Sequence, residues 1–85
     1  MTKEDIFSAF SYVFENDERI RETVFADADI PQDISEAVLN ISSLDFVELI
    51  IEIEEQLNLD SIPETAMEQG ITIDKLAERI LENVQ

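Results

Sequence analysis

The sequence contains no cysteine and no histidine, and each absence excludes a class of function. Without cysteine the chain can form neither a disulfide framework nor a thiolate metal site, which is consistent with a reducing cytoplasm. Without histidine, and with Lys3 and Lys75 as its only lysines, the chain offers its serines no obvious base to activate them. We therefore do not expect an enzyme.

Basic residues are also scarce. Five Lys and Arg stand against 21 Asp and Glu, which gives a net charge of −16, and no basic residue occurs from Glu22 to Asp74. Such a surface repels nucleic acids and anionic membranes, so we expect basic protein partners. The acidic segment with Asp27, Asp29 and Asp33 lacks the Gly and Glu that a calcium loop requires, and no metal site is expected there.

Long apolar runs are absent as well. None approaches the roughly 18 to 20 residues of a membrane span, and the stretch Met1–Asp5 lacks the features of a signal peptide. We expect a soluble, cytoplasmic monomer with a single domain over residues 1–85. A hydrophobic content of 45% is enough for a core and argues against disorder.

Apolar residues recur at helical spacing, and no segment looks like a strand. The first predicted helix follows a Thr2 cap and has Ile6, Phe10 and Phe14 on its core face. Polar residues interrupt this pattern at 15–17, and residues 18–25 either extend the helix or form a second short one. Residues 26–42 are predicted to form a long loop, which is either functional or contains an unrecognised element.

Three further helices complete the predicted fold. One runs over residues 43–57 with Asn58 as a left-handed C-cap, and a short one lies between Pro63 and Gly70. The last begins after a Thr72 cap and runs to about residue 84. The sequence thus predicts an all-α four-helix bundle, with three main helices, one short helix and a long loop after the first helix.

The helix at 43–57 has apolar residues on two faces. The core face comprises Phe46, Leu49, Ile50, Ile53 and Leu57. The second face comprises Leu44, Val47 and Ile51, and beside it runs an acidic strip of Asp45, Glu48, Glu52 and Glu55. Together the second face and the acidic strip predict a docking surface for a basic partner with a small apolar pocket. The alternative is a helix buried on more than one side, with an ordinary solvated acidic face.

The start of this helix carries two adjacent serines. Ser42 and Asp45 have the spacing of an N-cap serine and an acid at the third helical position. Ser43 then falls on the first turn, beside free backbone N–H groups and the positive end of the helix dipole. That environment favours an attached phosphate ester.

Two segments carry a family resemblance. "SSLDFVELIIEIEEQLNLDSIP", residues 42–63, resembles the helix that follows the Asp-Ser-Leu motif of acyl carrier proteins. "GITIDKLAERI", residues 70–80, is similar to the stretch leading into that family's final helix. The resemblance spans roughly residues 33–84 and implies the family's four-helix bundle. It also implies that a phosphopantetheinyl transferase, using coenzyme A and Mg²⁺, esterifies Ser43 with 4′-phosphopantetheine.

The resemblance further implies the function of an acyl carrier. The thiol of the arm would carry acyl groups as thioesters between enzymes of fatty-acid, lipid or polyketide-type biosynthesis. Leu44, Val47 and Ile51 would then meet apolar pockets on acyl-transferring and biosynthetic partner enzymes. The acidic residues Asp45, Glu48, Glu52 and Glu55 would pair with the Arg and Lys of their basic docking surfaces.

The chain departs from the family pattern before Ser43, where Asn40-Ile41-Ser42 replaces the usual Gly-x-Asp. Asn tolerates the left-handed conformation that Gly adopts, and Ser caps a helix nearly as well as Asp. The missing carboxylate and the long preceding segment suggest a specialised carrier, such as a D-alanyl or a discrete polyketide-type carrier. The alternative is an unmodified acidic helical module that keeps the carrier fold and binds a basic partner.

Overall fold

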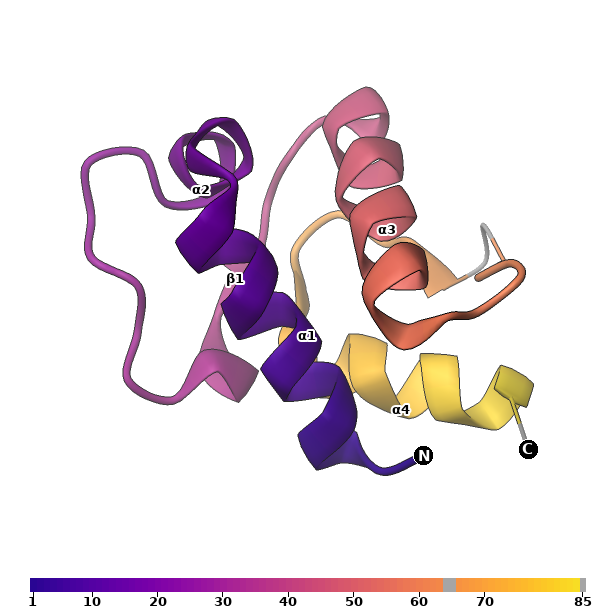
Figure 1. Cartoon of the computed structure of the whole chain (residues 1–85). Coiled ribbons are helices and arrows are strands. Elements are labelled where there is room, and N and C mark those ends of the chain that lie inside the picture. Colours follow the sequence, from indigo (N-terminus) through magenta and orange to yellow (C-terminus); the bar gives the residue numbers. More distant parts are fainter. Residues whose placement is uncertain (64–65, 85) are drawn as a thin grey trace.

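The computed structural model describes residues 1–63 and 66–84, and these residues are mostly helical (Figure 1). Within them the chain forms four α-helices, one short 3-10 helix and a two-stranded antiparallel sheet. The α-helices are α1 (Lys3–Asn16), α2 (Glu18–Phe25), α3 (Ser43–Leu57) and α4 (Ile73–Val84). The 3-10 helix is η1 (Ile34–Glu36), and the strands are β1 (Val38–Leu39) and β2 (Ile71–Thr72).

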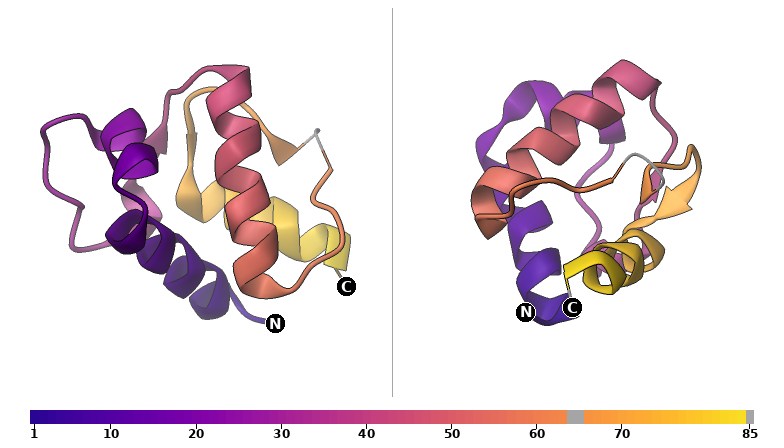
Figure 2. Two further views of the ribbon diagram at one scale, coloured as in Figure 1. Left: turned by 45° about the horizontal axis from the view of Figure 1, so that its top comes forward. Right: turned by 90° about the vertical axis from the view of Figure 1, so that its right-hand side faces the viewer.

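The apolar faces of α1, α3 and α4 meet in one hydrophobic core. Helix α1 packs against both α3 and α4, and α4 lies across the lower end of the molecule in Figure 1 and in the left view of Figure 2. The fully buried side chains include Phe10 and Phe14 of α1, Ile53 of α3 and Leu76 of α4. The core faces expected for the first helix and for the helix at 43–57 are therefore confirmed.

The helix ends follow the predicted capping residues. Thr2 and Asp5 form a capping box, in which the Thr2 hydroxyl accepts from the Asp5 N–H at 3.3 Å and the Asp5 carboxylate accepts from the Thr2 N–H at 2.9 Å. The Thr72 hydroxyl accepts from the Lys75 N–H at 3.1 Å. Asn58 ends α3 in the left-handed conformation, with φ 56° and ψ 44°.

Residues 18–25 form a separate helix and do not extend α1. Asp17 has an extended backbone with φ −117° and ψ 97°, which breaks the helix. Its backbone N–H donates to the Val13 carbonyl at the end of α1, and its side chain accepts from the Ile20 N–H at 3.2 Å at the start of α2. One aspartate thus ends one helix and caps the next. The short member of the four helices is α2.

The expectation of a chain without strands is wrong. Val38 and Leu39 pair with Thr72 and Ile71, respectively, in an antiparallel ladder. Each strand has two residues, which is too short to show the alternation by which strands are recognised in a sequence. The pairing, together with η1, gives structure to the predicted long loop and anchors the chain that leads into α3. Within this anchor Leu39 is fully buried.

The short helix predicted between Pro63 and Gly70 is wrong for residues 67–70, which are not helical, whereas Glu64 and Thr65 lie outside the described residues. The Ala66 N–H donates to the Pro63 carbonyl at 3.0 Å. The Gly70 N–H donates to the Leu39 carbonyl at 2.8 Å. Because β1 takes this backbone donor, the segment turns into β2 and a helix cannot continue through it.

Candidate functional site

The two serines at the start of α3 differ in their hydrogen bonds. The Ser42 hydroxyl accepts from the Asp45 N–H at 3.2 Å and donates to the Asp45 carboxylate at 2.9 Å. Ser43 is exposed, and no hydrogen bond joins its hydroxyl to another residue within 1–63 and 66–84. Ser42 is therefore occupied as the helix cap, as predicted, while the exposed hydroxyl of Ser43 has no hydrogen-bond partner among the described residues.

The backbone around Ser43 provides unpaired donors. The first N–H groups of an α-helix have no carbonyl within the helix to bond. At α3 the Asp45 N–H is bonded to the Ser42 side chain, and the Phe46 N–H is bonded to the Ser42 carbonyl at 2.9 Å. The N–H groups of Ser43 and Leu44 have no such partner among the described residues. Together with the helix dipole they favour an anion beside the Ser43 hydroxyl.

The predicted second apolar face of α3 is exposed. Leu44, Val47 and Ile51 are 70%, 38% and 47% exposed, whereas Phe46, Leu49, Ile50 and Ile53 are buried in the core. The division of α3 into a core face and an outer apolar face is therefore confirmed. Leu57, the last residue of the predicted core face, is partly buried against the core. Three neighbouring exposed apolar side chains next to a free hydroxyl make this end of α3 suitable for contact with another protein.

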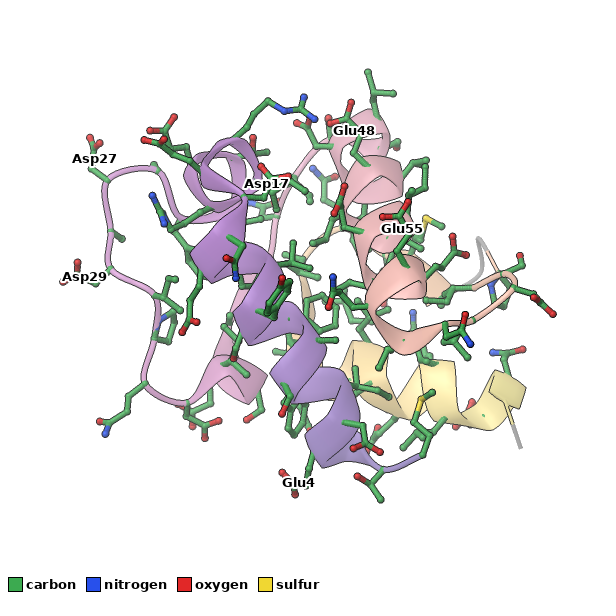
Figure 3. All side chains as sticks on the ribbon, in the orientation of Figure 1. Glu4, Asp17, Asp27, Asp29, Glu48 and Glu55 are labelled. Carbon is green, nitrogen blue, oxygen red and sulfur yellow. The ribbon has the colours of Figure 1, made fainter. Side chains whose placement is uncertain are left out.

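The acidic strip of α3 lies beside the outer apolar face, and Figure 3 shows Glu48 near the N-terminal end of the helix and Glu55 further along it. Its four members have different surroundings. Asp45 is half-buried and bonded to Ser42, and Glu48 forms an ion pair with Arg19 of α2 at 3.0 Å. Among the described residues, Glu52 and Glu55 have no cation within 4.0 Å. Glu52 and Glu55 are thus the members open to a partner's cations.

Glu54 lies in the same helix as the acidic strip but has a structural role. Its carboxylate accepts from the Ile62 N–H at 2.6 Å and so holds the segment after α3 against the helix. Ile62 is buried, and this bond joins the end of α3 to the core. Glu54 is therefore a structural residue rather than a member of the acidic strip.

A groove of about 300 Å³ opens beside Ser43. Its lining residues are Ile41, Ser43, Phe46, Val47, Met67 and Gln69. The sequence did not indicate Met67 or Gln69 as neighbours of Ser43, because it is the pairing of β1 with β2 that positions the segment before β2. Phe46 and Val47 could be placed near Ser43 from helical spacing alone.

The backbone before Ser43 differs from the expectation for Asn40. Only Ala26 and Asn58 among the described non-glycine residues have positive φ, so Asn40 does not adopt the left-handed conformation. Ile41 is buried on the core side of the chain and sets its path into α3. The chain therefore enters α3 without the special backbone that a glycine would provide.

Outside α3, Asp27 and Asp29 lie on the side of α2 that faces away from α3 in Figure 3. No group of three or more His, Cys, Asp or Glu in the described ranges is arranged to hold a metal ion. In the same ranges, no helix combines the length and apolar character that crossing a membrane requires.

No family model matches the chain, and no solved structure matches it.

Proposed function

We propose that this chain is an acyl carrier protein in which Ser43 bears a covalently attached 4′-phosphopantetheine arm. One observation supports this proposal above the others. Of two adjacent serines at the start of a long helix, one is occupied as the cap and the other has an exposed hydroxyl without a partner in the described chain. A helix needs only the first serine for its stability, so the second is available for modification.

The surroundings of Ser43 fit a phosphate ester. The unpaired N–H groups of Ser43 and Leu44 and the positive end of the α3 dipole would stabilise the negative charge of the phosphate. The groove of about 300 Å³ beside Ser43 offers apolar contacts from Ile41, Phe46 and Met67 to a group tethered at this position. When bound, the arm would supply the thiol that a chain without cysteine lacks, and that thiol carries acyl groups as thioesters.

The outer surface of α3 supports the partners that the proposal requires. The phosphopantetheinyl transferase and the acyl-transferring enzymes would place apolar side chains against Leu44, Val47 and Ile51, and Arg or Lys against the acidic strip. Exposed charge pairs of this kind steer encounter and fix orientation more than they hold the complex together. We propose that the protein works as a cytoplasmic monomer in fatty-acid, lipid or polyketide-type biosynthesis and is not itself an enzyme.

A second candidate function is an unmodified helical module that binds a basic protein. The observation in its favour is that Ser42 stands where acyl carrier proteins usually have an aspartate, which removes one carboxylate beside the attachment site. The docking surface on α3 does not depend on Ser43. Both functions therefore use the same face of the molecule and differ in the chemistry at one hydroxyl.

The mass of the intact protein tests the proposal directly. The protein is incubated with coenzyme A, Mg²⁺ and a broad-specificity phosphopantetheinyl transferase, with Ser43→Ala and Ser42→Ala as matched variants. We expect a gain of one phosphopantetheine in the wild type and in Ser42→Ala, and none in Ser43→Ala.

Protein purified from its own cells provides the second arm of the test, because a dedicated transferase could modify it there. If neither preparation carries phosphopantetheine, the carrier proposal is refuted and the unmodified module is favoured. A gain that persists in Ser43→Ala would refute the assignment of the site.

A further inference from the structure

An ion pair connects α2 to the acidic strip of α3. The guanidinium of Arg19 lies 3.0 Å from the carboxylate of Glu48. Within the part of the chain that the structure describes, Glu48 is the only carboxylate of α3 that has a cation within 4.0 Å. The crevice between α2 and this part of α3 encloses only about 10 Å³, so α2 closes this flank of the docking surface.

The ion pair is poorly suited to a structural role. The Arg19 side chain is 70% exposed and that of Glu48 is 35% exposed, and exposed ion pairs add little to stability. Arg19 also lies in the first turn of α2, where the helix dipole disfavours a positive charge. Neither the stability of α2 nor the core explains an arginine at this position, whereas its contact with Glu48 does.

Among the three glutamates of the acidic strip, Glu48 lies nearest to Ser43. At a rise of 1.5 Å per residue, Glu48 lies about 7.5 Å along the helix axis from Ser43, and Glu55 lies about 18 Å from Ser43. A partner that acts at Ser43 must therefore bring its cations close to Glu48. Any such cation meets the Arg19 guanidinium, which already occupies that carboxylate.

We infer that Arg19 is a specificity-determining residue that competes with the cations of partner proteins for Glu48. This inference rests on the proposed docking surface of α3. A partner presents Lys or Arg beside an apolar side chain, binds Glu52 and Glu55 directly, and reaches Glu48 only by displacing Arg19. Because the Arg19–Glu48 pair is exposed, displacing Arg19 costs little binding free energy. A partner whose cation lies close to Glu48 recovers this cost, and a partner whose cation lies elsewhere does not.

The test measures the affinity of a fluorescent amphipathic helical peptide made of leucine and lysine. The affinity of the peptide is measured in parallel for four proteins: the wild type, Arg19→Gln, Glu48→Gln and the double variant. We expect Arg19→Gln to tighten binding about 2- to 5-fold, the range that corresponds to an exposed ion pair. Glu48→Gln should weaken binding more in the Arg19→Gln background than in the wild type, because the carboxylate is then free.

Lys75→Gln is the matched control. It removes one positive charge from α4, where the Lys75 side chain is 60% exposed and pairs with Glu78. Lys75 forms its ion pair within α4 and not with the acidic strip, so at physiological salt the control should change the affinity much less than Arg19→Gln. Equal effects of Arg19→Gln and Lys75→Gln would mean that only net charge matters, and would overturn the inference.

Two further outcomes are decisive. If Glu48→Gln weakens binding by the same factor with and without Arg19, the two residues do not compete and the inference fails. If the peptide binds none of the variants, the docking surface itself is refuted. Because the peptide assay does not depend on Ser43, a chain that is never modified but shows the coupling would refute the carrier proposal and leave this inference standing.

Discussion

Replacing Ser42 and Ser43 in turn by alanine should have opposite consequences for stability and for modification. Ser42→Ala removes the acceptor of the Asp45 N–H and the donor to the Asp45 carboxylate, which lie at 3.2 Å and 2.9 Å. Loss of a serine N-cap costs about 1 kcal/mol of stability, within a range of roughly 0.5 to 2 kcal/mol. Ser43→Ala removes a hydroxyl without a partner in the described chain, and alanine is the better helix former, so the stability should stay level or rise slightly.

Thermal unfolding followed by circular dichroism at 222 nm measures this difference. A loss of 1 kcal/mol lowers the Tm of a domain of this size by roughly 4 to 8 °C. We therefore expect the Tm of Ser42→Ala to fall by about that amount and the Tm of Ser43→Ala to remain within about 2 °C of the wild type. The control is Ser42→Asn, which caps a helix as well as serine does and should retain the wild-type Tm.

Equal melting temperatures of the two alanine variants would contradict the assignment of Ser42 as cap and Ser43 as free hydroxyl. A larger loss for Ser43→Ala would mean that Ser43 holds the helix, and its availability for modification would then have no structural basis. The comparison needs no transferase, so it tests the geometry of the site independently of the proposed function.

Three further predictions concern stability. Ala26 follows α2 with φ 53° and ψ −121°, a region that favours glycine, so Ala26→Gly should stabilise the protein by about 0.5 to 1 kcal/mol in urea unfolding while Ala28→Gly should not. The hydrogen bond from Lys3 lowers the pKa of the exposed Glu78 carboxyl, so this pair stabilises the fold at neutral pH and its contribution is lost as the pH falls through that lowered pKa. The Tm difference between wild type and Lys3→Met should therefore shrink in acid, and a difference independent of pH would contradict this. Moderate salt or millimolar Mg²⁺ should raise the Tm by screening the charge of −16, and an unchanged Tm would contradict a role for self-repulsion.

The parts of the fold that depend on neighbouring residues could be predicted from the sequence. The caps at Thr2, Ser42 and Thr72 and the left-handed Asn58 follow from local hydrogen bonds, and each is present. The two apolar faces of α3 follow from helical periodicity alone. For this reason the sequence indicated which side chains of α3 are exposed, although it could not show what they contact.

The parts that depend on distant residues could not be predicted. The pairing of β1 with β2 joins segments more than 30 residues apart through only two residues on each side. That pairing positions Met67 and Gln69 beside Ser43 and prevents the helix that the local sequence suggested for residues 67–70. The contact between Arg19 and Glu48 likewise requires α2 to be a separate helix, which the interruption at Asp17 left undecided.

Two demands on the N-terminal end of α3 conflict if the proposed function is correct. Attraction of basic partners requires a dense acidic strip, whereas transfer of a phosphate-bearing arm brings negative charge close to the same carboxylates. The unpaired N–H groups of Ser43 and Leu44 meet part of the second demand. Arg19 also lowers the repulsion that the phosphate would meet, because its ion pair neutralises Glu48. Glu48 lies within two helical turns of Ser43. Glu52 and Glu55 lie further from Ser43 and can remain charged without opposing the phosphate, since repulsion between exposed charges decays over a Debye length of about 8 Å. Under the proposed function, the ion pair between Arg19 and Glu48 would thus reduce the conflict between an acidic docking surface and an anionic modification at Ser43.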